Sequence, residues 1–451
     1  MLSTSRMSSF VFMLKRYLKV TWPILCSTVI NYFIPITDLF MIAHLGIIPV
    51  AAVSISIDLF VVLSTFPIGL AYGLTPFILQ TNDKNASYEN SQWLRNSLLI
   101  NGFLSVFFGV LLYYSMHWLS YLGQDKKAVE MVVYYLPCLA LSLIPTMIYN
   151  TFSRYLEGIG RTKPLLIVNL VGFLCNVVLN YLLIFGPVRF FSNGLIGAGL
   201  ATLLSKIFMA IMLFPYVRET LFVRVKDALQ ASIFDVQRIK KLLVLGAPIG
   251  VQLLLEFAFF STMGLMVGGL GALHKGANAL LDNIISLPIG ITWALSLAAS
   301  TVVGDGNQKD SSQKRCSILV YYGTAGIVAT LCACCIVCAT SFLFMGIYKG
   351  SLEGYVLIHS SVFLAALFIL TDAFYTIGLG LLRGLKDTFF PFMIATLSNW
   401  LVGIPMCYLL IYRLRCGIEA IWLSKIIAFF LTGSILFFRC LKKNNERGFL
   451  C

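Results

Sequence analysis

Long apolar runs dominate the chain, and short segments rich in charge, glycine or proline separate them. Each run is long enough for a helix to cross a bilayer, which takes roughly 20 residues. The pattern predicts twelve membrane-spanning helices, at residues 19–44, 49–79, 93–119, 129–151, 164–186, 194–217, 240–268, 274–303, 316–346, 355–382, 389–412 and 416–438. Composition agrees: 59% of residues are hydrophobic and 12% charged, against about 25% charged in soluble domains. The sequence therefore predicts an all-α integral membrane protein.

The two halves of the chain repeat one another. Repeated segments include Pro67-Ile68-Gly69 with Pro288-Ile289-Gly290, Tyr181-Leu182-Leu183-Ile184 with Tyr408-Leu409-Leu410-Ile411, and Leu204-Ser205-Lys206-Ile207 with Leu423-Ser424-Lys425-Ile426. We expect two pseudo-symmetric six-helix lobes, at 1–217 and 240–451, joined by a cytoplasmic linker at 218–239. Parallel repeats of this kind build alternating-access transporters.

The net charge of +14 comes from 33 Lys and Arg residues against 19 Asp and Glu. The basic residues are scattered through short loops, with no basic block of the kind that binds nucleic acid. If the N-terminus is cytoplasmic, alternate loops on that side hold most of them, which favours both termini in the cytoplasm. We expect a multi-pass protein of the cell (inner) membrane. Basic residues lead straight into a full-length first span, so no cleaved signal peptide is expected. Nothing implies a required protein partner.

The first predicted span contains an acid. Thr28, Asn31, Pro35 and Asp38 share one helical face, and Pro35 leaves the carbonyl of Asn31 without its helical hydrogen bond. An intramembrane Asp costs about 2.5–3.5 kcal/mol on the translocon scale. We therefore expect Asp38 to face a protein-lined cavity, with Asn31, and to bind a cation or a proton there. The alternative is an Asp hydrogen-bonded to a neighbour for packing alone.

Two more acids lie deep in the second half. Glu256 shares a helical face with Gln252, and Asp372 shares one with Phe368 and Tyr375. We expect these polar and aromatic residues to line a substrate or ion cavity beside the acids. Carboxylates with oxygen neighbours suit a hard cation, and a buried carboxyl can instead take a proton. Glu256 and Asp372 form a candidate Na⁺ site, and the sequence leaves the choice between Na⁺ and H⁺ open.

The fifth span carries three asparagines on one face, Asn169, Asn176 and Asn180. They either line a cavity or hydrogen-bond to neighbouring helices.

Four other ionisable residues fall within spans: Asp58, Asp282, Lys206 and Lys425. We favour an acid–base pairing inside each lobe, because ionisable groups in membranes usually pair. The alternative is that they adapt the cavity to an unusual substrate, such as an anion.

Several motifs in order resemble the multidrug and toxic compound extrusion (MATE) family, in its NorM-like branch. They are Asp38-Leu39-Phe40-Met41-Ile42 before His44-Leu45-Gly46, Gly158-Ile159-Gly160-Arg161-Thr162, Asn176-Val177-Val178-Leu179-Asn180-Tyr181 and Gly197-Ala198-Gly199-Leu200-Ala201-Thr202. The resemblance implies two six-helix lobes in a V and cofactor-free export of cationic or amphipathic compounds in exchange for Na⁺ or H⁺. It nominates Asp38, Glu256 and Asp372 as coupling residues, with Asn176 and Asn180 near the first of them. One departure is the turn at residues 80–85, which lacks the family's glycine.

Three other functions compete with export. A flippase for lipid-linked precursors, from the same superfamily, predicts basic residues lining a central cavity. A membrane receptor or scaffold would transport nothing. An enzyme is disfavoured because the four histidines lie in separate segments without metal-ligand spacing, and no phosphate-binding loop is present. The cysteines at 332, 334, 335 and 338 are interpreted as helix packing rather than a metal site.

Overall fold

The computed structural model describes residues 21–31, 33–38, 40–78, 86–122, 126–186, 194–221, 235–268, 270, 272–304, 311–347 and 352–448. All regular structure in these residues is helical. Twelve helices are long and apolar enough to cross a membrane, which confirms the predicted number of spans. The spans are Thr21–Leu45, Ile48–Ile78, Ser87–Leu119, Val129–Gly158, Lys163–Phe185, Gly194–Leu221, Val236–Val267, Leu281–Gly304, Ile318–Cys338, His359–Gly384, Phe389–Arg413 and Glu419–Lys443.

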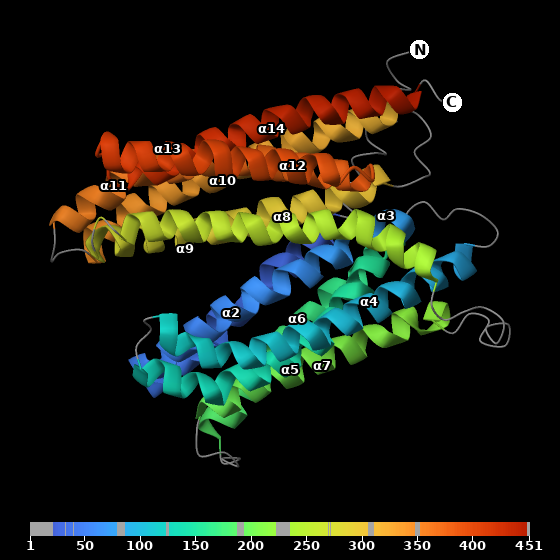
Figure 1. Ribbon diagram of the computed structural model, residues 1–451, viewed down its shortest axis with the longest axis horizontal. Coiled ribbons are helices and arrows are strands. Elements are labelled where there is room, and N and C mark those ends of the chain that lie inside the picture. The colour runs from blue at the N-terminus through green and yellow to red at the C-terminus, as the bar shows by residue number, and fades with distance from the viewer. Residues whose placement is uncertain are drawn as a thin grey trace. The chain divides into compact units, whose positions relative to one another are not determined.

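In the first half of the chain, a succession of helices comes after the first span (Figure 1). They are η1 (Ala43–Leu45), α2 (Ile47–Tyr72), α3 (Thr75–Ile78), α4 (Ala86–Ser115), η2 (Met116–Leu122), α5 (Lys126–Gly158), α6 (Lys163–Asn180), η3 (Tyr181–Phe185) and α7 (Gly194–Leu221).

The second half has the same order. Its helices are α8 (Val236–Gly268), α9 (Ala272–Gly304), α10 (Ser311–Ile347), α11 (Leu352–Gly384), α12 (Phe389–Leu397), η4 (Ser398–Gly403), α13 (Ile404–Tyr408), η5 (Leu409–Arg413) and α14 (Glu419–Gly448). The fifth and eleventh spans both end in a π-helical turn, η3 and η5, at repeated positions. The repeat read from the sequence thus extends to local backbone geometry.

Contacts divide the chain into two compact units. The N-terminal unit is Cys26–Val251, and the C-terminal unit is Gln252–Cys451 with residues 21–25. Both divisions fall inside helices, the first span and α8, rather than in the charged segment 218–239. Residues 222–234 of that segment lie outside the described residues. The lobe boundaries drawn from the sequence stay a prediction.

Each unit is built around one central helix. In the N-terminal unit α5 packs against α2, α4 and α7, and in the C-terminal unit α11 packs against α9, α10 and α14. These are the fourth and tenth spans, which occupy equivalent places in the repeat. Their burial on several sides follows from this position, and α11 is the most buried of the spans.

Glycine permits the close packing of α2 against the start of α8 in the N-terminal unit. A Cβ added to Gly69 would lie 2.4 Å from Cα of Gly250, and one added to Gly246 would lie 2.6 Å from the carbonyl oxygen of Leu70. Real Cβ atoms essentially never approach so closely. The backbones of these two helices are therefore in direct contact.

Candidate functional site

Asp38 is the centre of a polar site in the N-terminal unit. Its side chain is buried, and it accepts hydrogen bonds from two other helices. Nδ2 of Asn180, at the end of α6, donates to Oδ1 over 2.5 Å, and Oγ1 of Thr202, on α7, donates to Oδ2 over 3.2 Å. Asn180 also donates to Oδ1 of Asn176, one turn earlier, over 3.2 Å. Neutral donors thus hold both carboxylate oxygens.

The asparagine face of α6 contacts neighbouring helices along its length. Asn169 accepts a hydrogen bond from the Tyr149 hydroxyl over 2.7 Å and donates to Oγ of Ser27. Asn169, Asn176 and Asn180 are all fully buried. Of the two interpretations of these residues, hydrogen bonding between helices applies to Asn169 and Asn180. The hydrogen bond from Asn180 also places an amide against the carboxylate of Asp38.

Lys206 lies on α7 one turn after Thr202, and its charge acts electrostatically on Asp38. Within the described residues, no ion pair joins Lys206 to Asp58, whose side chain is exposed on α2. The acid–base pairing expected for the first lobe is therefore absent there. Lys206 instead lies near enough to the buried Asp38 to interact with it electrostatically.

Glu256 and two other predicted residues form a chain of hydrogen bonds in the C-terminal unit. Nε2 of Gln252 donates to the Tyr375 hydroxyl over 3.0 Å, and that hydroxyl donates to Oε2 of Glu256 over 3.1 Å. Gln252 and Tyr375 are buried, and Glu256 is half-buried. The structure therefore brings together the polar faces of α8 and α11 that the sequence indicated.

Asp372 lies on α11 less than one turn before Tyr375. Oγ1 of Thr292, on α9, donates to its Oδ2 over 2.7 Å, and Oγ1 of Thr376 donates to its Oδ1 over 3.3 Å. Asp372 and Glu256 are near enough to interact electrostatically, so two negative charges there would repel each other. Two carboxylates with hydroxyl oxygens are a donor set that fits a hard cation such as Na⁺, and one shared proton would relieve the same repulsion.

The two remaining cavity candidates have different surroundings. Asn31 is half-buried, two helical turns before Asp38. Phe368 is fully buried, one turn before Asp372, and its ring packs edge-on against Phe429 at a centroid distance of 5.1 Å. Phe368 therefore belongs to an aromatic cluster beside the acids.

Sequence reasoning missed the hydroxyls of Thr202 and Thr292. Thr202 belongs to the Gly-Ala-Gly-Leu-Ala-Thr motif, which was the available signal for it. Thr292 had no signal, because threonine is common in helices and often donates to a carbonyl three or four residues back, as Thr292 does to Ile289.

The predicted acid–base pairing is present in the second half. Nζ of Lys425, on α14, lies 3.0 Å from Oδ1 of Asp282, on α9. Nδ2 of Asn278 donates to the other carboxylate oxygen over 2.7 Å. Sequence proximity gave no sign of this partner, because Lys425 and Asp282 lie on different helices.

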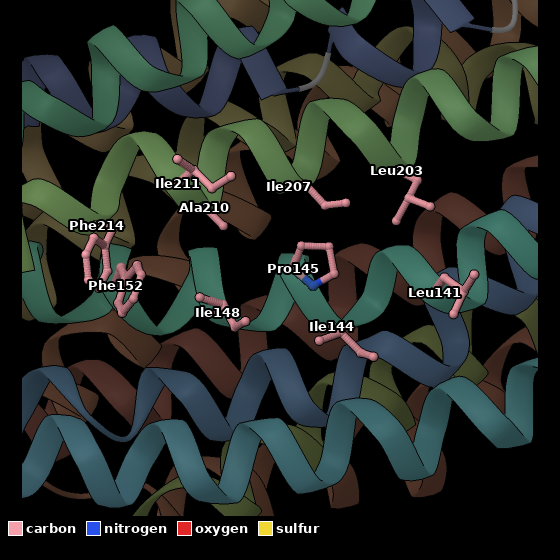
Figure 2. Close-up of a pocket in the computed structure, with 10 residues that line it drawn as sticks. All are labelled: Leu141, Ile144, Pro145, Ile148, Phe152, Leu203, Ile207, Ala210, Ile211 and Phe214. Atoms are coloured by element: carbon pink, nitrogen blue, oxygen red, sulfur yellow. The ribbon is translucent and has the colours of Figure 1, made fainter.

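An apolar hollow of about 590 Å³ lies between α5 and α7. Figure 2 shows its lining: Leu203, Ile207, Ala210, Ile211 and Phe214 on α7 face Leu141, Ile144, Pro145, Ile148 and Phe152 on α5. A hollow of similar size lies between α11 and α14, at the equivalent place in the repeat. The first hollow has no polar side chain to bind an ion, and the exposed side chains of Leu141 and Ile211 suit contact with lipid. Neither is the candidate ion site.

The described histidines, cysteines and acids form no group of three that could hold a metal ion. Cys332, Cys334, Cys335 and Cys338 are free thiols on α10. The turn at residues 80–85 that departs from the family pattern lies outside the described residues.

Comparison with known proteins identifies the relatives of this chain. It is 24% identical to a probable multidrug resistance protein NorM of Mannheimia succiniciproducens, covering 96% of this chain and 94% of the relative. It is 26% identical to the multidrug resistance protein MdtK of Yersinia enterocolitica, with 90% and 89% covered.

Solved structures share the fold. The eukaryotic MATE transporter AtDTX14 superposes with a TM-score of 0.85 at 18% identity, covering 97% of this chain and 99% of the other. The Vibrio cholerae MATE transporter VcmN in its bent form gives a TM-score of 0.84 at 16% identity, with 98% and 99% covered. These relatives are transporters rather than enzymes, which agrees with the absence of catalytic motifs in the sequence.

The model of one family, MatE, matches the chain twice, at residues 23–182 and 248–409. The two matches cover both halves and so confirm the internal repeat. This multi-pass membrane protein, with its fold of twelve spans, belongs to the MatE family of transporters.

Proposed function

We propose that the protein is a secondary active antiporter that exports cationic or amphipathic compounds in exchange for Na⁺ or H⁺. One observation carries the proposal. Three carboxylates inside spans, those of Asp38, Glu256 and Asp372, accept hydrogen bonds from neutral donors. In the described part of the chain, none of the three forms an ion pair with a Lys or Arg. A carboxylate in hydrocarbon is costly until a cation or proton neutralises it.

The proposed mechanism uses this cost. With no ion bound, the three carboxylates are charged and favour the conformation in which they reach water. Binding of Na⁺ or H⁺ removes the charge and favours the other conformation. Because a ligand shifts an equilibrium only by its difference in affinity for the two states, the energy of the ion gradient is used through these residues.

The relatives' names support the substrate class. NorM of M. succiniciproducens and MdtK of Y. enterocolitica are both named as multidrug resistance proteins. Multidrug export fits a chain that covers about nine-tenths of each of them. We extend this substrate class to the protein as part of the proposal.

We place the protein in the inner membrane of the cell, with both termini in the cytoplasm. Most of the 33 Lys and Arg residues fall in the loops and tails of that side under this arrangement. Attaching a reporter that works only in the cytoplasm to each end would test it, since a silent reporter at either end contradicts the orientation.

The test of transport uses purified protein in liposomes that contain ethidium. An inward Na⁺ gradient and an inward pH gradient are imposed in separate experiments, with protein-free liposomes as the control. Ethidium efflux driven by one gradient supports antiport and identifies the ion. Absence of efflux with both gradients contradicts the proposal, and would favour the flippase or a non-transporting receptor or scaffold.

The structure offers little support for the flippase alternative. That function predicts basic residues lining a cavity. Lys425 is instead buried against Asp282, with a side chain only 3% exposed. Small cationic compounds therefore remain the better substrate class.

A further inference from the structure

The ammonium group of Lys425 is surrounded by aromatic rings as well as by Asp282. Nζ lies 4.3 Å from the ring centroid of Trp422, 5.1 Å from that of Phe260 and 5.7 Å from that of Phe368. The three rings come from α14, α8 and α11, and Asp282 comes from α9. We call Phe260, Phe368, Trp422 and Asp282 the ammonium box.

This box has the chemistry that recognises an organic cation. Aromatic faces attract cations, and several rings around one ammonium form the cages that bind quaternary ammonium ligands. A carboxylate supplies the opposite charge. Phe368 and Trp422 are fully buried, so water competes little for a cation between them and the attraction is stronger than at a surface.

We propose that the ammonium box is a binding site for a substrate's organic cation, and that Lys425 occupies the site until that cation displaces it. The proposal rests on the proposed function only in treating the cation as a transported substrate. No residue of the box except Phe368 belongs to the coupling and cavity residues nominated from the sequence.

The carboxylate is placed to receive an incoming cation. The Asp282 side chain is 43% exposed, whereas that of Lys425 is 3% exposed. Asn278 holds Oδ2 of Asp282, while Lys425 contacts Oδ1. Asn278 therefore fixes the orientation of the carboxylate when Lys425 leaves, and the arriving cation finds a preformed partner.

A tethered cation also explains how the box is stable without substrate. Without Lys425, Asp282 would hold an unpaired negative charge in a box whose aromatic faces attract cations. Lys425 neutralises the box when no substrate is present. Exchange of one ammonium for another then keeps the charge balanced, at the cost of freeing a flexible side chain.

The box adjoins the proposed coupling site. Phe260 follows Glu256 by four residues on α8, and Phe368 precedes Asp372 by four residues on α11. One helical turn, roughly 6 Å along each axis, therefore separates the box from both acids. A cation in the box and an ion at the acids would interact electrostatically, which is a direct route for exchange of one for the other.

The first test measures binding of tetraphenylphosphonium to purified full-length protein by equilibrium dialysis, without any gradient. Lys425→Met removes the tethered cation and keeps an apolar side chain of similar length. We expect it to bind the probe about tenfold more tightly than wild type, the scale of a desolvated cation–aromatic interaction. Lys241→Met, which removes a charge from an exposed position on α8, is the matched control and should leave the affinity unchanged. Equal affinities in wild type and Lys425→Met would overturn the proposal.

A second test uses wild-type protein and does not depend on the folding of a variant. An amine-acetylating reagent is applied with and without tetraphenylphosphonium, and modification of Lys425 is measured by mass spectrometry. Displacement exposes the amine, so the probe should increase modification of Lys425 and leave that of Lys241 constant. Unchanged or reduced modification of Lys425 at saturating probe would overturn the proposal.

A double variant assigns the binding to the box. In Lys425→Met, the further change Trp422→Leu removes the nearest ring and should abolish the gain in affinity. A retained gain would place the probe elsewhere and contradict the proposal. These binding results do not depend on ion-driven transport, so failure of the antiport proposal would be recognised separately, by absent efflux in liposomes.

Discussion

The hydroxyl of Tyr375 donates a hydrogen bond to Oε2 of Glu256 over 3.1 Å and accepts one from Gln252 over 3.0 Å. Tyr375 lies on α11, the central helix of the C-terminal unit, while Gln252 and Glu256 lie on α8. A charged acceptor makes such a bond stronger than one between neutral groups. The bond therefore links the charge state of Glu256 to the contact between two helices.

Tyr375→Phe removes this link and keeps the ring. Since hydrogen bonds to charged groups are worth about 1.5–3 kcal/mol, we expect gradient-driven efflux to fall by about tenfold while the protein stays folded. Efflux from liposomes measures the effect. Tyr408→Phe, at an exposed tyrosine on α13, is the control. An unchanged rate in Tyr375→Phe would mean that the hydroxyl has no part in coupling.

Gly69→Ala should destabilise the protein. The new Cβ would lie 2.4 Å from Cα of Gly250, so α2 and α8 must separate, at a cost of about 1–3 kcal/mol for overpacking. Gly102→Ala is the matched control on α4, where an added Cβ meets nothing within 4 Å and alanine favours the helix by about 1 kcal/mol. The thermal midpoint in detergent should fall for the first and rise slightly for the second. Equal midpoints would contradict the direct backbone contact.

The turns after α5 and α11 both contain a left-handed residue, so introducing glycine in one and removing it from the other should have opposite effects. In both turns a backbone N–H bonds back five residues, from Arg161 to Leu156 and from Asp387 to Leu382. The left-handed residue is Gly160 in the first, at φ 72°, and Lys386 in the second, at φ 58°.

A left-handed residue with a Cβ costs about 1 kcal/mol. Lys386→Gly should therefore raise the thermal midpoint, and Gly160→Ala should lower it. A fall in the midpoint with Lys386→Gly would show that the lysine side chain stabilises its turn by more than the strain costs.

Asp235 caps the start of α8 and should make stability depend on acid pH. It accepts hydrogen bonds from the backbone N–H of Arg238 over 3.1 Å and of Gln237 over 3.0 Å, and the Arg238 side chain pairs with it over 2.7 Å. The backbone bond from Arg238, with help from the arginine charge, lowers the pKa of Asp235.

A lowered folded pKa stabilises the protein above the unfolded value, about 3.9, and this stabilisation is lost as pH falls through the folded value. Asp235→Ala should cost about 1 kcal/mol or less at pH 7, the usual worth of an N-cap. The difference between the thermal midpoints of wild type and variant should shrink below pH 4. A difference that is constant from pH 7 to pH 3 would contradict the charged cap.

Much of the fold could be predicted from the sequence, because each apolar run is long enough for one membrane span and the repeated segments of the two halves are recognisable. One span limit was inaccurate because two charges pair inside a helix. The fourth predicted span ended at residue 151, but α5 continues to Gly158. Arg154 pairs with Glu157 over 2.6 Å and lies over the Tyr72 ring, so these charges are satisfied within the helical bundle.

The candidate acids could also be identified from the sequence, because an ionisable residue in an apolar run is rare. Their hydrogen-bond partners could be identified only in part. Asn180 and Tyr375 were singled out by helical spacing, whereas Thr292 reaches Asp372 from another helix. Contacts between helices depend on helix rotation and packing, which apolar spacing alone does not determine. The box around Lys425 was missed for the same reason.

The central claim is that the buried carboxylates couple export to an ion gradient, and Asp38→Asn tests it most directly. Asparagine keeps the shape of the side chain and an oxygen for Asn180, so the variant should fold with a thermal midpoint near that of wild type. Asp58→Asn, at the exposed acid on α2, controls for loss of a charge. We predict that ethidium efflux under the effective gradient is abolished in Asp38→Asn and in the double variant Glu256→Gln with Asp372→Asn, and retained in Asp58→Asn. Full efflux in the first two would contradict the account.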